Sequence, residues 1–141
     1  MTLHLYNSTI STVKDLVVDA SCILEFLLNQ QGKDFVVQQI GSKGLVAPQC
    51  LPYEIGNAVS KLIKQKFISI FDAVAVYHEF VRIPIRLVEP DISDAIMLAG
   101  NTESYAYDAY YISVAKRLGM PLFTLDANMK ANAQKQEVSC L

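Results

Sequence analysis

The stretch Leu16-Val17-Val18-Asp19-Ala20-Ser21 decides how the rest of the chain is interpreted. Its apolar run is typical of a strand that is covered on both faces, as in a parallel sheet. The run ends in the carboxylate of Asp19, which is followed by a small residue and a hydroxyl. We therefore expect a central buried strand that carries Asp19 at its carboxyl end.

Strand-like and helical segments alternate along the rest of the chain. Strands are predicted near residues 16–18, 44–48, 83–88 and 120–125, with a short closing strand at 137–141. Helices are predicted near residues 20–28, 34–40, 52–66, 70–81, 93–100, 104–118 and 129–134, where apolar residues recur at helical spacing. The alternation favours an α/β three-layer sandwich, in which a central, mostly parallel sheet of four to five strands has helices on both faces.

The composition fits one domain with a substantial core. The chain has 141 residues, of which 52% are hydrophobic, and it shows no internal repeat or interdomain linker. We therefore expect a single domain over residues 1–141, with residues 1–14, rich in Ser and Thr, as an N-terminal extension. The formal net charge of −2 gives no overall nucleic-acid signature.

The cysteines and histidines give little sign of a zinc site or a disulfide framework. Cys22, Cys50 and Cys140 are odd in number and form no C-x-x-C pair. Free thiols suit a reducing cytosol, and neither a signal peptide nor a membrane-spanning segment is evident. A cytoplasmic protein that does not enter a membrane is expected. His4 and His78 are interpreted as surface or packing residues.

Four acidic residues stand where a parallel sheet would gather them. Asp19 and Asp126 follow predicted strands, whereas Glu54 and Asp108 lie in the first turns of predicted helices. Ligands of open parallel sheets bind beyond the carboxyl ends of the strands, so all four acids are expected at one edge. Singly, Asp19 and Asp126 could be helix N-caps, and Glu54 could be a first-turn acid favoured by the helix dipole.

Asp108 is harder to explain without a site. On a helical wheel the wet side of its helix is defined by Ser113, Lys116 and Arg117, and the packed side by Tyr107, Tyr110, Tyr111, Val114, Ala115 and Leu118. On this wheel Asp108 points away from the solvent-facing side, and no lysine or arginine lies one turn away on its face. An unpaired buried carboxylate is costly, so a metal ion or a basic partner is expected beside it.

Carboxylates that converge at one edge repel one another, and a divalent cation relieves the repulsion. Ligation by oxygen alone, with no histidine or cysteine nearby, suits Mg²⁺ or Mn²⁺ rather than zinc. Such ions activate water and stabilise charge in phosphoryl chemistry. The hydroxyls of Ser21 and Thr124 lie two positions from Asp19 and Asp126 and could orient the carboxylates or bound water. Helix capping by Ser21 remains an open alternative.

The chain resembles PIN-domain proteins of the kind found as the toxin half of VapBC toxin–antitoxin pairs. The resemblance is carried by VVDAS at 17–21, PYEIGNA at 52–58, YDAYYISVA at 107–115 and LFTLD at 122–126. These segments follow the order and usual spacing of the family and span residues 15–134. No single segment is specific, and the ordered set carries the resemblance.

The resemblance implies a metal-dependent ribonuclease in which Asp19, Glu54, Asp108 and Asp126 match the acidic metal-binding quartet of the family. It also implies a homodimer and a small antitoxin that occupies the active-site groove. The sequence departs from the family pattern in two ways. Fourteen or so residues precede the first strand, which often begins almost at the start of these proteins, and the net charge is acidic although the expected substrate is RNA. A local basic rim could be supplied by Lys61, Lys64, Lys116, Arg117 and Lys130, although taken singly each of them fits an ordinary solvated surface position better.

The leading hypothesis is a Mg²⁺- or Mn²⁺-dependent endoribonuclease that hydrolyses RNA phosphodiester bonds with an activated water. Asp19 and Asp108 are expected to bind the metal directly, Glu54 to act as ligand or general base, and Asp126 to act directly or through water. The alternative is a non-catalytic PIN-like binding or regulatory module whose acidic pocket binds a basic side chain of a partner or has only a structural role. A phospho-acceptor domain with Asp91 as acceptor lacks the required late lysine, and no G-x-G-x-x-G supports a dinucleotide fold.

Overall fold

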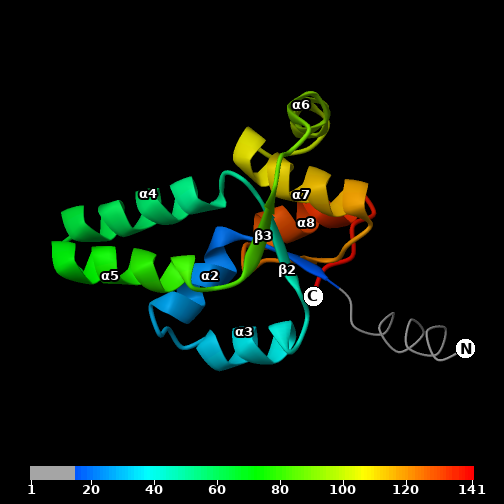
Figure 1. The fold of residues 1–141 in the computed structure, drawn as a ribbon. Helices are drawn as coiled ribbons and strands as arrows, with labels where there is room; N and C mark the ends of the chain where they lie inside the picture. The colour runs from blue at the N-terminus through cyan, green and yellow to red at the C-terminus, as the bar shows by residue number, and fades with distance from the viewer. Residues whose placement is uncertain (1–14) are drawn as a thin grey trace, which may run out of the picture.

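The structure, a computed structural model, describes residues 15–141 (Figure 1). The expected extension at residues 1–14, with His4, lies outside the described residues. The strands are β1 (Leu16–Val18), β2 (Leu45–Pro48), β3 (Ile85–Val88) and β4 (Leu122–Phe123). The helices are α2 (Ala20–Leu27), α3 (Lys33–Ile40), α4 (Leu51–Lys64), α5 (Ile70–Val81), α6 (Ile92–Gly100), α7 (Ala106–Leu118) and α8 (Ala127–Lys135).

The four strands form one sheet in the order β3-β2-β1-β4, and every strand pair is parallel. Val17 of β1 lies opposite Val46 on one side and Leu122 on the other. All three residues of β1 are fully buried, which confirms the prediction of a strand covered on both faces. The predicted closing strand at 137–141 is reduced to a single bridge between Leu122 and Cys140.

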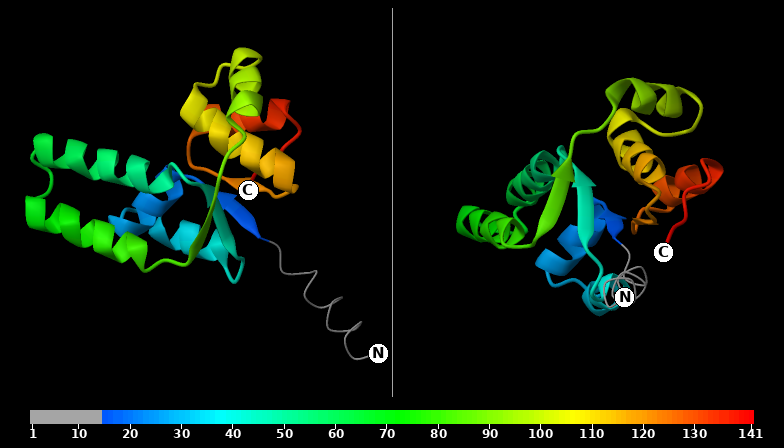
Figure 2. Two further views of the ribbon diagram at one scale, coloured as in Figure 1. Left: turned by 45° about the horizontal axis from the view of Figure 1, so that its top comes forward. Right: turned by 45° about the vertical axis from the view of Figure 1, so that its right-hand side comes forward.

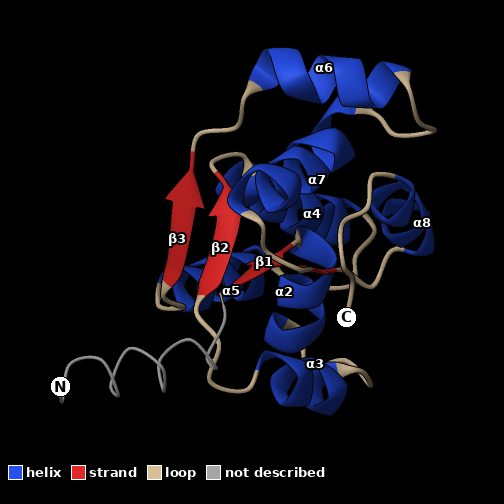
Figure 3. Cartoon of the chain, turned by 90° about the vertical axis from the view of Figure 1, so that its right-hand side faces the viewer, coloured by secondary structure: helices blue, strands red, loops and turns tan. Residues whose placement is uncertain are grey.

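Helices cover both faces of the sheet. Each of the strands β2 and β3 is added next to the preceding strand on the same side of β1. The chain then crosses back over the sheet, and β4 pairs with the other side of β1. Right-handed crossovers therefore put α2–α5 on one face and α6 and α7 on the opposite face. Figures 2 and 3 show these layers, and Figure 1 shows α4 and α5 as a pair that projects beyond the sheet. The predicted α/β sandwich is confirmed.

The wet side predicted for α7 is wrong at Ser113. This residue is buried, and its hydroxyl donates a hydrogen bond to Asp94 Oδ2 at 2.7 Å. The reason is that α6 packs against α7 and covers the face that the helical wheel assigned to solvent. Conversely, Tyr107 and Leu118, which were assigned to the packed side, are exposed.

Two further findings concern the cysteines and the length of the helices. Cys22, Cys50 and Cys140 are free thiols, as predicted. None of the helices within residues 15–141 combines the length and the apolar character needed to span a membrane.

Candidate active site

The four acids lie at the carboxyl edge of the sheet. Asp19 directly follows β1, and Asp126 lies just beyond β4, its neighbour in the sheet. Glu54 is in the first turn of α4, which begins shortly after β2. Because α7 leads back to the start of β4, its own first turn, with Asp108, lies at the opposite, carboxyl edge. The order of the strands reverses between β1 and β4, and ligands bind at such switch points.

Asp19 is held from both of its carboxylate oxygens. It is only 3% exposed. Its Oδ1 accepts hydrogen bonds from Ser21 Oγ at 2.7 Å and from the Cys22 amide at 3.3 Å, and the latter caps α2. Its Oδ2 accepts a hydrogen bond from Thr124 Oγ1 at 2.6 Å. Burial raises the pKa of Asp19 above its ordinary value, and these hydrogen bonds oppose the rise because they favour the charged form.

Ser21 and Thr124 link the loops that follow β1 and β4. Besides donating to Asp19, the Ser21 hydroxyl accepts a hydrogen bond from the Leu125 amide at 3.0 Å. The Thr124 hydroxyl likewise accepts one from the Asp126 amide at 3.0 Å. Ser21 is thus not the cap of α2. Both hydroxyls orient the Asp19 carboxylate and fix the loop that carries Asp126.

Asp126 is exposed and is the N-cap of α8. Its Oδ1 accepts hydrogen bonds from the amides of Asn128 at 2.8 Å and Met129 at 3.0 Å. The capping role anticipated for an aspartate at this position is therefore real. It fixes one carboxylate oxygen and leaves the Oδ2 oxygen without a hydrogen bond to the described residues.

Glu54 is fixed by two side chains that sequence reasoning did not assign to the site. Its Oε2 accepts a hydrogen bond from Tyr111 Oη at 2.6 Å and one from Cys50 Sγ at 3.2 Å. Burial raises the pKa of Glu54, the Tyr111 and Cys50 hydrogen bonds lower it, and the charges of Asp19 and Asp108 raise it. Burial and the adjacent Glu54 raise the pKa of Cys50 to about 12, so this thiol is protonated and can donate.

The signal for this contact was present in the sequence. Tyr111 was placed on the packed side of its helix, and it is fully buried. A buried tyrosine hydroxyl normally finds a hydrogen-bond partner. Which partner it finds depends on the packing of α7 across the sheet edge, and the sequence pattern does not contain that information.

Asp108 is half-buried at the start of α7. Burial raises its pKa, and the charges of Asp126 and Asp19 raise it further. The charges of these carboxylates therefore influence one another across segments that lie far apart in the sequence. Neither of the two ion pairs found within residues 15–141 involves any of the four acids.

These donors fit a divalent cation by their chemistry. They are carboxylate and hydroxyl oxygens, three of the four carboxylates have raised pKa values, and no cationic side chain is paired with them in the described chain. Their spacing is looser than that of a formed site. In residues 15–141 no three acidic, histidine or cysteine side chains are close enough to bind one ion together. Side-chain movement is therefore required for several of them to share an ion.

The structure places four of the five suggested rim residues away from this edge, whereas Lys130 lies one turn after Asp126 in α8. Lys116 and Arg117 are in the last turn of α7, about 12 Å along the helix from Asp108. Lys61 and Lys64 are likewise in the last turn of α4, whereas Glu54 is in its first turn. The reason is that both helices run away from the acidic edge.

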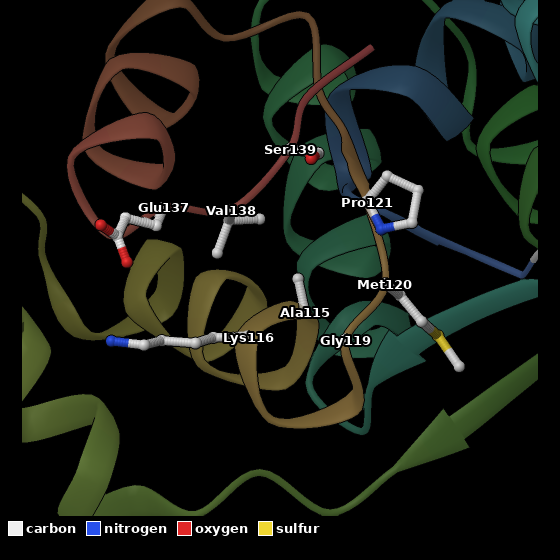
Figure 4. Close-up of a pocket in the computed structure, with 8 residues that line it drawn as sticks. All are labelled: Ala115, Lys116, Gly119, Met120, Pro121, Glu137, Val138 and Ser139. Atoms are coloured by element: carbon white, nitrogen blue, oxygen red, sulfur yellow. The ribbon is translucent and has the colours of Figure 1, made fainter.

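A pocket of about 360 Å³ lies at the other end of α7 (Figure 4). Lys116 and Glu137 are on one side of it, and Met120 and Pro121 are on the other. Pro121 precedes β4, so this pocket is at the amino edge of the sheet, opposite the acids. It is separate from the candidate site.

Comparisons with known proteins agree with the fold and the motifs. A family model described as PIN domain matches residues 16–135. Ribonuclease VapC12 of Mycobacterium tuberculosis is 27% identical over 116 residues, which is 81% of this chain and 88% of that protein.

Two solved structures have the same fold. PAE2754 from Pyrobaculum aerophilum gives a TM-score of 0.71 at 21% identity, covering 89% of this chain and 82% of that one. Mycobacterium tuberculosis VapC20, described as a Sarcin-Ricin loop cleaving toxin, gives a TM-score of 0.60 at 14% identity. The match covers 83% of this chain and 94% of that one. Because the PIN-domain model matches most of the length of this chain, the chain belongs to the PIN-domain family.

Proposed function

We propose that this protein is a metal-dependent endoribonuclease that hydrolyses RNA phosphodiester bonds, and that it is the toxin of a toxin–antitoxin pair. The observation that carries the proposal is the gathering of Asp19, Glu54, Asp108 and Asp126 at one edge, where no cationic side chain from residues 15–141 forms an ion pair with them. Membership of the PIN-domain family and the likeness to Ribonuclease VapC12 support it.

Each acid has a role that suits its contacts. A bound Mg²⁺ or Mn²⁺ ion would neutralise the scissile phosphate and lower the pKa of a water molecule. Asp19, whose orientation is set by hydrogen bonds, and Asp108 would bind the ion directly. Glu54 uses Oε2 to accept from Tyr111. Its other oxygen is therefore available to bind the ion or to take a proton from water. Asp126 would act directly or through water.

The test is cleavage of a mixed RNA pool with Mg²⁺ or Mn²⁺. Wild type is compared with Asp19→Asn and Asp108→Asn, each of which removes one negative charge at nearly constant volume. The matched control is Asp34→Asn, because Asp34 is an exposed acid in the first turn of α3. We expect kcat to fall at least about a hundredfold in the two site variants and to stay unchanged in the control. Removal of one group that stabilises charge in the transition state typically has an effect of this size.

Equal cleavage by all four proteins would contradict the assignment of these acids. Cleavage that persists after removal of divalent cations by EDTA would contradict the metal dependence. Correct folding of each variant is checked by circular dichroism.

One observation favours a second candidate, a non-catalytic PIN-like binding or regulatory module. The acids of the described residues are not spaced tightly enough to bind one ion without movement. In such a module the acidic edge would accept a basic side chain of a partner. A protein that neither binds divalent cations at millimolar concentration nor cleaves RNA would support the module.

We also propose a cytoplasmic homodimer that binds a small antitoxin. The three free cysteines support a reducing compartment. Exposed apolar side chains support protein partners, because such patches usually mark interaction sites. One group lies on α6 (Ile92, Ile96 and Met97), and another lies around the turn between α4 and α5 (Phe67, Ile70 and Phe71).

A further inference from the structure

A second pocket is lined by Glu54, and the proposed chemistry uses none of its other lining residues. Its volume is about 290 Å³, near the lower end of the range for small-ligand sites. It is formed between the start of α2, the first two turns of α4 and the start of α7. The residues that line it are Ala20, Leu24, Tyr53, Glu54, Asn57, Ala58 and Tyr107. Glu54 is therefore shared between this pocket and the candidate active site.

Two exposed tyrosines form part of this pocket. Tyr53 is 79% exposed and immediately precedes Glu54, and Tyr107 is 59% exposed and immediately precedes Asp108. Each tyrosine is thus the sequence neighbour of one of the acids. The ring of Tyr107 is supported edge-to-face by Tyr110, with centroids 5.7 Å apart. These rings present flat apolar surfaces in a pocket that Glu54 also lines.

The other walls suit an uncharged planar group. Ala20, Leu24 and Ala58 supply apolar surface, and among the residues that the structure describes no lysine or arginine lines the pocket. Asn57 lies one helical turn after Tyr53 on the same face of α4. Its side-chain amide is exposed and forms no hydrogen bond within residues 15–141, so both its donor and its acceptor can face a ligand.

We propose that this pocket binds one unstacked base of single-stranded RNA, next to the bond that is cut. The base packs against the rings of Tyr53 and Tyr107, and Asn57 forms hydrogen bonds with its edge. Aromatic stacking of splayed bases and amide contacts to base edges are how proteins commonly recognise single-stranded RNA. The inference rests on the proposed ribonuclease function and names the feature of the substrate that this site recognises.

The test measures the binding of fluorescein-labelled single-stranded RNA oligonucleotides to the full chain in Ca²⁺, followed by cleavage in Mn²⁺. Tyr53→Ala and Tyr107→Ala are each expected to weaken binding about tenfold. Tyr53→Phe and Tyr107→Phe are expected to keep most of the affinity, because phenylalanine preserves the stacking surface. The matched control is Tyr105→Ala, since Tyr105 is 85% exposed near the same helix start but does not line the pocket.

An abasic nucleotide identifies the position of the base. Moving one abasic site along the oligonucleotide should find a position at which wild type loses about tenfold in affinity and Tyr53→Ala or Tyr107→Ala loses little more. Such non-additivity shows that ring and base contact each other. With Asn57→Ala, the ranking of oligonucleotides that differ only in that base should flatten.

The proposal would be overturned if Tyr53→Ala and Tyr107→Ala bound RNA with the same affinity as Tyr105→Ala. The pocket would then be a candidate site for a side chain of a partner protein. If wild type cleaves RNA while the tyrosine variants behave like the control, the base pocket alone fails. If wild type neither binds nor cleaves any RNA, the proposed function fails with it.

Discussion

At the scale of single residues, a structural role and a role in the site coexist. Asp19 caps α2, and Asp126 caps α8. For Asp19 the cap uses one oxygen, while Thr124 holds the other at 2.6 Å. A cap restricts the rotamer of the side chain, which is also what a metal ligand requires. The alternatives of cap and ligand therefore do not exclude each other.

Tyr111 is expected to tune metal binding through Glu54. Tyr111→Phe keeps the buried ring and removes the 2.6 Å hydrogen bond to Glu54 Oε2. Loss of such a supporting contact typically lowers metal affinity about tenfold or more. Calorimetric titration with Mn²⁺ measures the affinity without substrate. Tyr110→Phe is the control, because the Tyr110 hydroxyl forms no hydrogen bond with the described residues, and unchanged affinity in Tyr111→Phe would show that the contact is only structural.

At the scale of elements, local pattern predicted most of the helices and strands. The helix at residues 70–81 has the predicted bounds, and each parallel strand was expected. The environment of a helix face could not be predicted in the same way. Ser113 looked solvated because it shares a face with Lys116, yet α6 covers it. Hydrophobic periodicity reports which side of a helix is apolar, and it does not report which other helix will pack there.

The position of the four acids at one edge could be predicted, because their places at strand ends and helix starts are local properties of the sequence. The partners of Glu54 were not found, because Tyr111 lies 57 residues away in sequence. Four of the five residues suggested for a basic rim lie away from the acids for a related reason. Lys116 is near Asp108 in the sequence, but the length of α7 separates the two side chains.

The outer face of α6 is expected to form the homodimer interface. Ala95 and Leu98 are buried against the core, whereas Ile92, Ile96 and Met97 are exposed, so this helix has apolar side chains on both sides. Analytical ultracentrifugation should find a dimer for wild type and a monomer for Ile96→Glu. Phe71→Glu, which charges the exposed surface of α5, should remain dimeric. A dimer that persists in Ile96→Glu would contradict this interface.

At the scale of the whole molecule, the topology explains why the acids meet. β1 and β4 are neighbours although their sequences are more than 100 residues apart, and helices from both faces begin at the same edge. Three of the carboxylates gathered there, those of Asp19, Glu54 and Asp108, have raised pKa values. The metal-free folded state therefore holds these protons more tightly than the unfolded state does. Its stability should fall as the pH rises from acid through these pKa values to neutral.

The central claim is that acids from four separate segments form one metal-binding site. Its most direct test is thermal unfolding at neutral pH, with and without millimolar Mn²⁺, for wild type, Asp108→Asn and the exposed control Asp34→Asn. Without metal, Asp108→Asn should unfold a few degrees higher than wild type, because one repelling charge is gone. Mn²⁺ should raise the Tm of wild type and of the control by several degrees, and that of Asp108→Asn by much less. A wild-type Tm that does not respond to Mn²⁺, or an equal response in Asp108→Asn, would contradict the claim.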